Sequence, residues 1–98
     1  MKTLYVSTPM QNKSQVEIES NISYCYNDAE TLLKDKLTLI DTMSNILKFD
    51  TFGECLASNL QLLAKADYAY FDDNWQTSRG CKIEHDFADA YGIKIIRD

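Results

Sequence analysis

Short β-branched and apolar segments alternate with longer stretches of helical periodicity along this chain, and this alternation limits the possible folds more than any other feature. The chain has 98 residues, which is enough for one domain. Four segments are rich in strand-forming residues: 3–6, 37–40, 68–71 and 93–96. Strands that alternate with helices predict a parallel sheet with right-handed crossovers. We therefore expect a single α/β domain over residues 1–98 with about four strands.

Periodic apolar residues and capping signals predict the helices. Ser14 and Glu17 form a capping-box pattern before a helix over about residues 15–35, and Thr51 and Glu54 form another before a helix to about residue 65. A last helix is expected from about Arg79 to Tyr91, followed by Gly92 at C′. Residues 41–50 are expected to form a loop, with room for one helical turn. The expected inward faces comprise Ile18, Ile22, Cys25, Tyr26, Ala29, Leu32 and Leu33, then Phe52, Cys55, Leu56, Leu60 and Leu63, and finally Ile83, Phe87, Ala90 and Tyr91.

Composition and charge exclude several functional classes. The chain carries 10 basic and 15 acidic residues, a net charge of −5, which argues against a nucleic-acid-binding surface. The three cysteines, Cys25, Cys55 and Cys81, form no CxxC pair, so we expect free thiols in a reducing cytoplasm rather than a disulfide framework or a zinc site. No apolar run predicts a signal peptide or a membrane span. Neither a GxGxxG motif, a P-loop lysine nor metal-ligand spacing occurs, so no cofactor and no metal are expected.

Two polar segments follow the first and third expected strands. Ligands of parallel sheets bind beyond the carboxyl ends of the strands, and residues 7–10 and 72–80 lie at such ends. Within the second segment, Ser78, Arg79 and Gly80 open a helix, where free N–H groups and an arginine suit a phosphate or carboxylate. An ordinary helix cap with a surface arginine fits the same residues.

Three further residues are candidates for a site. Glu84, one turn into the last helix, has the chemistry to attack a sugar carbon or activate water, although a surface glutamate is the simpler interpretation. Tyr5 either orients such a carboxylate or belongs to the core. Trp75 either stacks on a base or sugar or covers the end of the core. The only histidine, His85, diverges from Glu84 by about 100° around the helix.

These residues resemble the nucleoside 2-deoxyribosyltransferase-like superfamily. The resemblance rests on Tyr5-Val6-Ser7-Thr8-Pro9-Met10, on Ala66-Asp67-Tyr68-Ala69-Tyr70, on Trp75, on Ser78-Arg79-Gly80 and on Glu84-His85-Asp86-Phe87-Ala88. It covers nearly the whole chain and is strongest to a DUF4406-like branch of small proteins from bacteria and phages. It implies a flavodoxin-like (Rossmann-like) parallel sheet with helices on both faces.

The resemblance also implies an activity, which is cleavage or exchange of the N-glycosidic bond of nucleosides or nucleotides. Glu84 then corresponds to the nucleophile, Tyr5 to the residue that orients it, and Ser78 with Arg79 to the phosphate contacts. Trp75 or Met10 is expected to line the base pocket. The remaining expected substrate-binding residues are Ser7, Thr8, Pro9, Asp72 and Gly80. The expected partners are a small nucleoside or nucleotide and a second copy of the chain in a homodimer or larger oligomer.

One position departs from the pattern that the resemblance implies. Active members usually carry an aspartate, which protonates the leaving base, where this chain has Asn59. An amide cannot act as a general acid. The chain is therefore expected to be a slow enzyme, to use another donor such as Asp72 or Asp73, or to be a module that senses or sequesters a nucleotide. A protein-interaction domain on the same fold is the third alternative.

Overall fold

All four predicted strands are present and lie parallel in one sheet. The computed structural model describes all residues, 1–98. Its strands are β1 (Lys2–Ser7), β2 (Leu37–Leu39), β3 (Tyr68–Phe71) and β4 (Lys94–Arg97), in the order β2-β1-β3-β4. The helices are α1 (Gln15–Leu33), α2 (Met43–Lys48), α3 (Phe52–Leu63) and α4 (Arg79–Ala90), with a short 3₁₀ helix over Trp75–Thr77. The predicted α/β class and the flavodoxin-like arrangement are confirmed.

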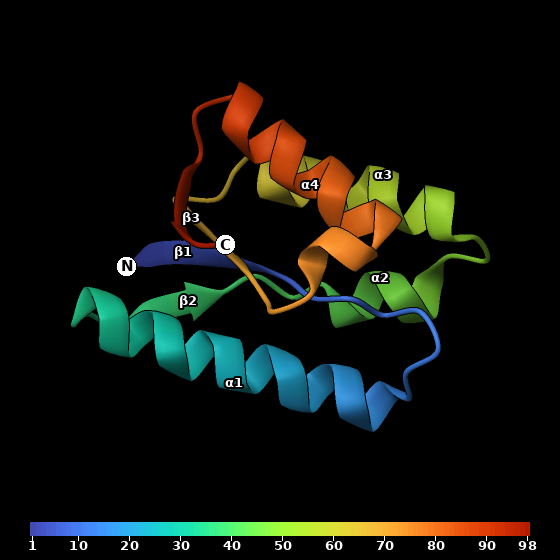
Figure 1. Ribbon diagram of the computed structural model, residues 1–98, viewed down its shortest axis with the longest axis horizontal. Helices are drawn as coiled ribbons and strands as arrows, with labels where there is room; N and C mark the ends of the chain where they lie inside the picture. Colours follow the sequence, from blue (N-terminus) through green and yellow to red (C-terminus); the bar gives the residue numbers. More distant parts are fainter.

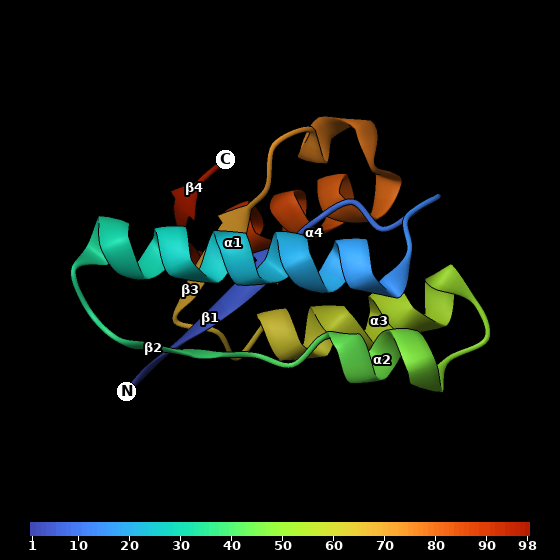
Figure 2. The same cartoon turned by 90° about the horizontal axis from the view of Figure 1, so that it is seen from below.

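Helices cover both faces of the sheet. Helix α1 lies along one face, and α3 and α4 lie on the other (Figure 1). The view from below places β2 and β4 at opposite edges and brings α2 beside α3 (Figure 2). None of the helices is both long enough and apolar enough to cross a membrane.

Side-chain alternation along β1 divides the core into two parts. Leu4 and Val6 are buried against the inward residues of α1, whereas Tyr5 is buried on the opposite face with Leu63 and Ala88. A strand with both faces covered is expected to be apolar almost throughout, and residues 4–6 are all at most 2% exposed. Because side chains alternate along a strand, Tyr5 and Ser7 both point toward α3 and α4.

Side-chain caps fix where the helices begin. Ser14 and Glu17 form the predicted capping box, with hydrogen bonds of 3.1 and 3.3 Å. Thr51 accepts the N–H of Glu54 at 3.1 Å, but here the Glu54 carboxylate accepts the threonine hydroxyl rather than the backbone N–H. The predicted second capping box is therefore only half formed. Gly92 has φ +71°, the left-handed conformation expected of a residue just past a helix end.

The segment expected to be a loop, residues 41–50, contains the helix α2. The Asp41 carboxylate accepts both the N–H and the hydroxyl of Ser44, at 3.2 and 2.6 Å, which satisfies donors at the helix start. Met43 and Ile46 pack against the core on the α1 side. The sequence left room for one helical turn here but did not predict the full six-residue helix, because none of its residues is fully buried and no apolar stripe results.

Several residues expected to face inward are exposed. On α4 the buried residues are Cys81, Glu84 and Ala88. The face assigned from the sequence was wrong at Tyr91, which is 74% exposed, and at Ile83, which is 41% exposed, whereas Phe87 packs against the core as predicted. The helix turns a carboxylate inward because that carboxylate has hydrogen-bond partners on the sheet. The other errors are Ala90, which is exposed, and Leu32 and Phe52, which are 52% and 71% exposed.

The strand order creates an open crevice between the ends of β1 and β3. The chain moves from β1 outward to β2, then crosses back to place β3 on the other side of β1. The connections that leave β1 and β3 therefore diverge, as at the switch points where α/β proteins bind ligands. The N–H of Asp72 donates to the carbonyl of Ser7 at 2.9 Å and holds the two strand ends together. Both polar segments singled out in the sequence lie here.

Candidate functional site

A buried carboxylate on α4 is the centre of the site. Glu84 is only 6% exposed, and both of its oxygens accept hydrogen bonds from β1. The Tyr5 hydroxyl donates to Oε2, and the Ser7 hydroxyl donates to Oε1 at 2.7 Å. The two donors share one face of β1 because they are two residues apart. The sheet thus fixes both the position and the rotation of the carboxylate.

Burial and hydrogen bonding act in opposite directions on the pKa of Glu84 and in the same direction on the pKa of Tyr5. Desolvation raises the pKa of the Glu84 carboxyl above its ordinary value, and the bonds from Tyr5 and Ser7 lower it in part. Burial, followed by the nearby negative charge of Glu84, raises the pKa of the Tyr5 phenol well above its ordinary value. The phenol therefore remains a proton donor to the carboxylate, which is the role that orients an ionised glutamate.

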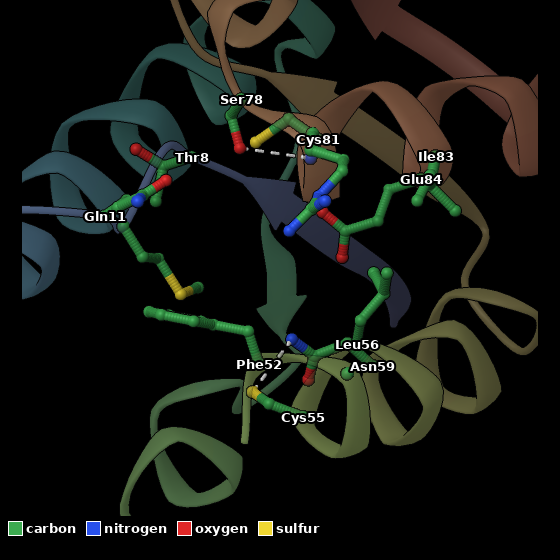
Figure 3. Close-up of a pocket in the computed structure, with 14 residues that line it drawn as sticks. Thr8, Gln11, Phe52, Cys55, Leu56, Asn59, Ser78, Cys81, Ile83 and Glu84 are labelled. Carbon is green, nitrogen blue, oxygen red and sulfur yellow. Dashed lines mark hydrogen bonds between the residues drawn. The ribbon is translucent and has the colours of Figure 1, made fainter.

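Glu84 faces a cavity of about 280 Å³ between α3, α4 and the loop after β1. This volume lies just below the roughly 300–1,000 Å³ typical of ligand pockets. Figure 3 shows the Glu84 carboxylate and the Asn59 amide entering the cavity from opposite sides, α4 and α3. The other predicted site residues on its wall are Thr8, Met10, Ser78, Arg79 and Gly80.

The start of α4 provides the positive side of this cavity. Ser78 is the N-cap, and its Oγ accepts the N–H of Cys81 at 3.3 Å. Arg79 is the only basic residue on the cavity wall and makes no ion pair. Gly80 has open space around its Cα, with the nearest atom to an added Cβ 4.0 Å away. An arginine, a helix N-terminus and a cap hydroxyl together suit an oxyanion.

Asn59 lies opposite Glu84 and is held by a residue that the sequence did not single out. Asn45, on α2, donates to Asn59 Oδ1 at 2.7 Å, and Asn59 is 4% exposed. With its oxygen engaged by Asn45, the Asn59 amide nitrogen faces the cavity and makes a 3.7 Å contact with the sulfur of Cys55. The amide therefore offers a hydrogen-bond donor, not a transferable proton, to a ligand.

Four predicted substrate-binding residues do not line this cavity. Ser7, expected to bind substrate, lies beneath Glu84 and bonds to it instead. Pro9 and Asp72 line a neighbouring polar cavity, where Thr8 Oγ1 donates to Asp72 Oδ2 at 2.9 Å. Trp75 lines neither cavity.

Trp75 packs against His85, the residue that follows Glu84 in the sequence. Its ring stacks on His85 with centroids 4.1 Å apart, and His85 Nε2 lies 2.9 Å from the carboxylate of Asp98. The indole Nε1 is buried without a hydrogen-bond partner. Of the two interpretations of this tryptophan, the structure shows it covering the end of the core beside Phe71.

Sequence reasoning missed the apolar and thiol parts of the wall. Phe52, Leu56 and Ile83 line the cavity, and the thiols of Cys55 and Cys81 lie on it. All three cysteines are free and buried, as expected. Their position relative to Glu84 was not predicted, because their spacing along the chain carries no signal for it. No group of three or more His, Cys, Asp or Glu side chains is arranged to hold a metal ion.

Comparison with known proteins gives one family match. Residues 2–97 match the family described as "Domain of unknown function (DUF4406)". No curated protein and no solved structure matches the chain. The match spans both ends of the sheet and every residue of the cavity wall.

Proposed function

The chain belongs to the DUF4406 family, and we propose that it cleaves or transfers the N-glycosidic bond of a nucleoside 5′-monophosphate or nucleoside with Glu84 as the nucleophile. One observation carries this proposal: the Glu84 carboxylate is buried in a cavity wall with both oxygens oriented by hydroxyl donors. A glutamate on the protein surface would not have its carboxylate fixed by two buried hydroxyl groups. A fixed carboxylate at the end of a cavity is suited to attack on a sugar carbon.

The reaction would proceed in two steps. In the first, a Glu84 oxygen forms a bond to C1′ of the sugar while the C1′–N bond breaks, and the base leaves with that electron pair and takes up a proton from water. The product is a glycosyl ester on Glu84. In the second step, water or the nitrogen of another base attacks C1′ and releases the carboxylate. Tyr5 and Ser7 stay hydrogen-bonded to the carboxylate in the free enzyme and hold it for the next cycle.

The charge of the wall supports a phosphorylated substrate. Arg79 and Glu84 are the only charged residues on it. Arg79 has no ion-pair partner, and Ser78 caps the helix that begins beside it. A phosphate placed here would meet the arginine fork and the positive end of α4, each favourable for an anion. Arg79 and Ser78 therefore are the proposed phosphate-binding residues.

Asn59 supports a second function, a binding module that senses or sequesters a nucleotide with little or no catalysis. The amide is fixed by Asn45 and cannot donate a proton to a leaving base. General acid assistance is typically worth about 10²–10⁴-fold in rate, so its loss would leave a slow reaction unless another acid serves. The alternative donors, Asp72 and Asp73, both lie in the neighbouring cavity, where Asp72 is bonded to Thr8 and Asp73 lies 3.6 Å from the guanidinium of Arg97.

The experiment that separates these functions measures released base. The protein is incubated with a panel of nucleosides and nucleoside 5′-monophosphates, and free base is followed by mass spectrometry for the wild type and for Glu84→Ala. The proposal expects release from at least one member that disappears in the variant. If no member releases base but one raises the melting temperature, the function is binding. If there is neither release nor a thermal shift, both functions are wrong.

A further inference from the structure

A second, larger cavity lies on the other side of Ser78. It has a volume of about 520 Å³ and is enclosed by the loops that follow β1 and β3. Thr8, Gln11 and Ser78 line both cavities, so the two adjoin at the switch point of the sheet, and we call them together the cleft. A ligand that occupied both cavities would pass Ser78.

The two cavities differ in chemistry. The first has six hydrophobic lining residues and the second has none. The wall of the second carries amides, hydroxyls and three charged groups, Lys13, Asp72 and Asp73. This wall suits a group rich in hydroxyls better than an apolar ring, because amides and carboxylates both pair with hydroxyls.

The charged groups of the second cavity are not equivalent. Asp72 accepts the Thr8 hydroxyl at 2.9 Å and the backbone N–H of Asp73 at 2.8 Å, so its carboxylate is held in place. The Asp73 carboxylate lies 3.6 Å from the guanidinium of Arg97. Lys13 makes no ion pair. It is thus the one cation of this cavity, and it is free to pair with an anionic ligand.

The two unpaired cations lie on either side of Ser78 along the cleft. Arg79 lines the first cavity and Lys13 the second, while Ser78 lines both. A single phosphate needs only the first. A second phosphate, linked to the first, would pass Ser78 and reach the side of the cleft that holds Lys13.

We infer that the second cavity binds a sugar joined through a second phosphate to the nucleotide, so that the ligand class is a nucleoside diphosphate carrying a sugar. The inference rests on the proposed function for the nucleotide half. Lys13 contacts the second phosphate, and the amides of Asn12, Asn21 and Asn74 contact sugar hydroxyls. Asn12 and Asn74 adopt left-handed conformations, with φ of 64° and 67°, in the two loops that form the cavity.

The test compares ligands with and without the extension. Dissociation constants are measured by calorimetry for two matched pairs, AMP with ADP-ribose and UMP with UDP-glucose. In at least one pair the extended ligand is expected to bind about tenfold more tightly or better, since each tenfold corresponds to one or two added polar contacts. Lys13→Gln and Asn21→Ala should each reduce this gain several-fold and leave the affinity for the mononucleotide unchanged. Lys82→Gln, on the exposed side of α4, is the control and should change neither constant.

Each outcome decides between the two proposals. If mononucleotides bind and lose their base in a Glu84-dependent reaction but the extension adds no affinity in either pair, the inference is wrong and the proposed function stands. If the gain persists undiminished in both Lys13→Gln and Asn21→Ala, the sugar lies elsewhere and the inference is again wrong. If the wild type binds no member of either pair and releases no base from the wider panel, the inference and the proposed function are both overturned.

Discussion

The Tyr5 hydroxyl on β1 donates a hydrogen bond to the Glu84 carboxylate on α4, and the two residues are 79 positions apart in the sequence. The bond joins the central strand to the helix that covers it. It satisfies two polar groups that are both almost fully buried, and an unpaired group in either place would cost about 1–3 kcal/mol. The same contact that stabilises the core thus sets the geometry of the proposed nucleophile.

Replacing Tyr5 with phenylalanine should shift the pH dependence of base release. The Tyr5 bond lowers the pKa of Glu84 against the effect of burial, so its loss raises that pKa further and moves the rising limb of the pH–rate profile to higher pH. A hydrogen bond to a charged group is worth about 1.5–3 kcal/mol, so we expect a rate about 10- to 100-fold lower at neutral pH. Tyr26→Phe, which removes a bond to the Leu37 carbonyl far from the cavity, should leave the profile in place. A profile that is equally unmoved in Tyr5→Phe would contradict this account of Glu84.

The substitution Glu84→Gln should change how stability depends on pH. Burial raises the folded-state pKa of Glu84 above its ordinary value of 4.5, so the protonated side chain is the form that the fold favours. The contribution of Glu84 to the free energy of unfolding is fully present below the unfolded-state pKa. It is lost as the pH rises through the folded-state pKa. Glutamine cannot ionise, and therefore the variant should gain stability relative to the wild type as the pH rises above the ordinary glutamate pKa of 4.5.

Urea unfolding at several pH values measures this difference. Glu30→Gln is the matched control, because the pKa of Glu30 is lowered in the fold whereas that of Glu84 is raised. The N–H of Leu37 bonds to the Glu30 carboxylate and lowers its pKa, so its contribution is present at neutral pH and lost on acidification. Relative to the wild type, Glu30→Gln should lose stability as the pH rises. If the stability of both variants relative to the wild type changed with pH in the same direction, burial would not raise the pKa of Glu84.

Introducing an acid at Asn59 should accelerate the proposed reaction. Asn59→Asp places a carboxyl in the cavity wall opposite Glu84, where its proton can reach the leaving base, and we expect base release about 10²-fold faster or more near the pH at which this acid is protonated. Asn59→Ala removes the amide without adding an acid and should give no acceleration. Rates for Asn59→Asp that stay at the wild-type level across the pH range would mean that the leaving group needs no acid at this place.

Arg79 should determine the preference for phosphate. Arg79→Gln removes the only cation of the cavity wall, so the affinity for nucleoside 5′-monophosphates should fall about tenfold or more, while that for the corresponding nucleosides stays within about twofold. Lys82→Gln removes an equal charge from an exposed position of the same helix. An equal loss in both variants would show a general effect of net charge and not a phosphate contact.

The core on the α3–α4 side should be sensitive to truncation. Leu63 is fully buried beside Tyr5 and Ala88, so Leu63→Ala should lower the free energy of unfolding by about 2–5 kcal/mol. Leu47 is 69% exposed, and Leu47→Ala should change it by no more than about 0.5 kcal/mol. Urea denaturation of the two variants at one pH gives both values, and a small effect at Leu63 would be inconsistent with the packing of this layer.

The sheet and three of the four α-helices could be predicted because their signals are local. A buried strand such as 68–71 is apolar throughout, and a capping box such as Ser14 with Glu17 marks a helix start whatever the helix packs on. Helix α2 was missed because most of its side chains are not inward, and a short helix of that kind has no periodicity to detect.

The buried face of α4 could not be derived from hydrophobicity. A pattern of apolar residues selects Ile83 and Tyr91, yet the helix buries Glu84 because two hydroxyls on β1 compensate the carboxylate. Such compensation depends on residues far away in the sequence. The sequence made Glu84 a candidate, but a surface glutamate was the simpler interpretation, and only the family resemblance favoured Glu84 as a site residue. The hydrogen bond from Asn45 to Asn59 is likewise a tertiary contact, since it joins two separate helices. The sequence shows neither that these two residues are partners nor which of them donates.

The most direct test of Glu84 as the nucleophile is the search for the covalent intermediate. The wild type is quenched with acid during turnover of the best nucleotide, digested, and analysed by tandem mass spectrometry. The account predicts a sugar phosphate attached through an ester to Glu84, and no adduct in Glu84→Gln. Base release without any adduct on Glu84, or release that continues in Glu84→Gln, would contradict it.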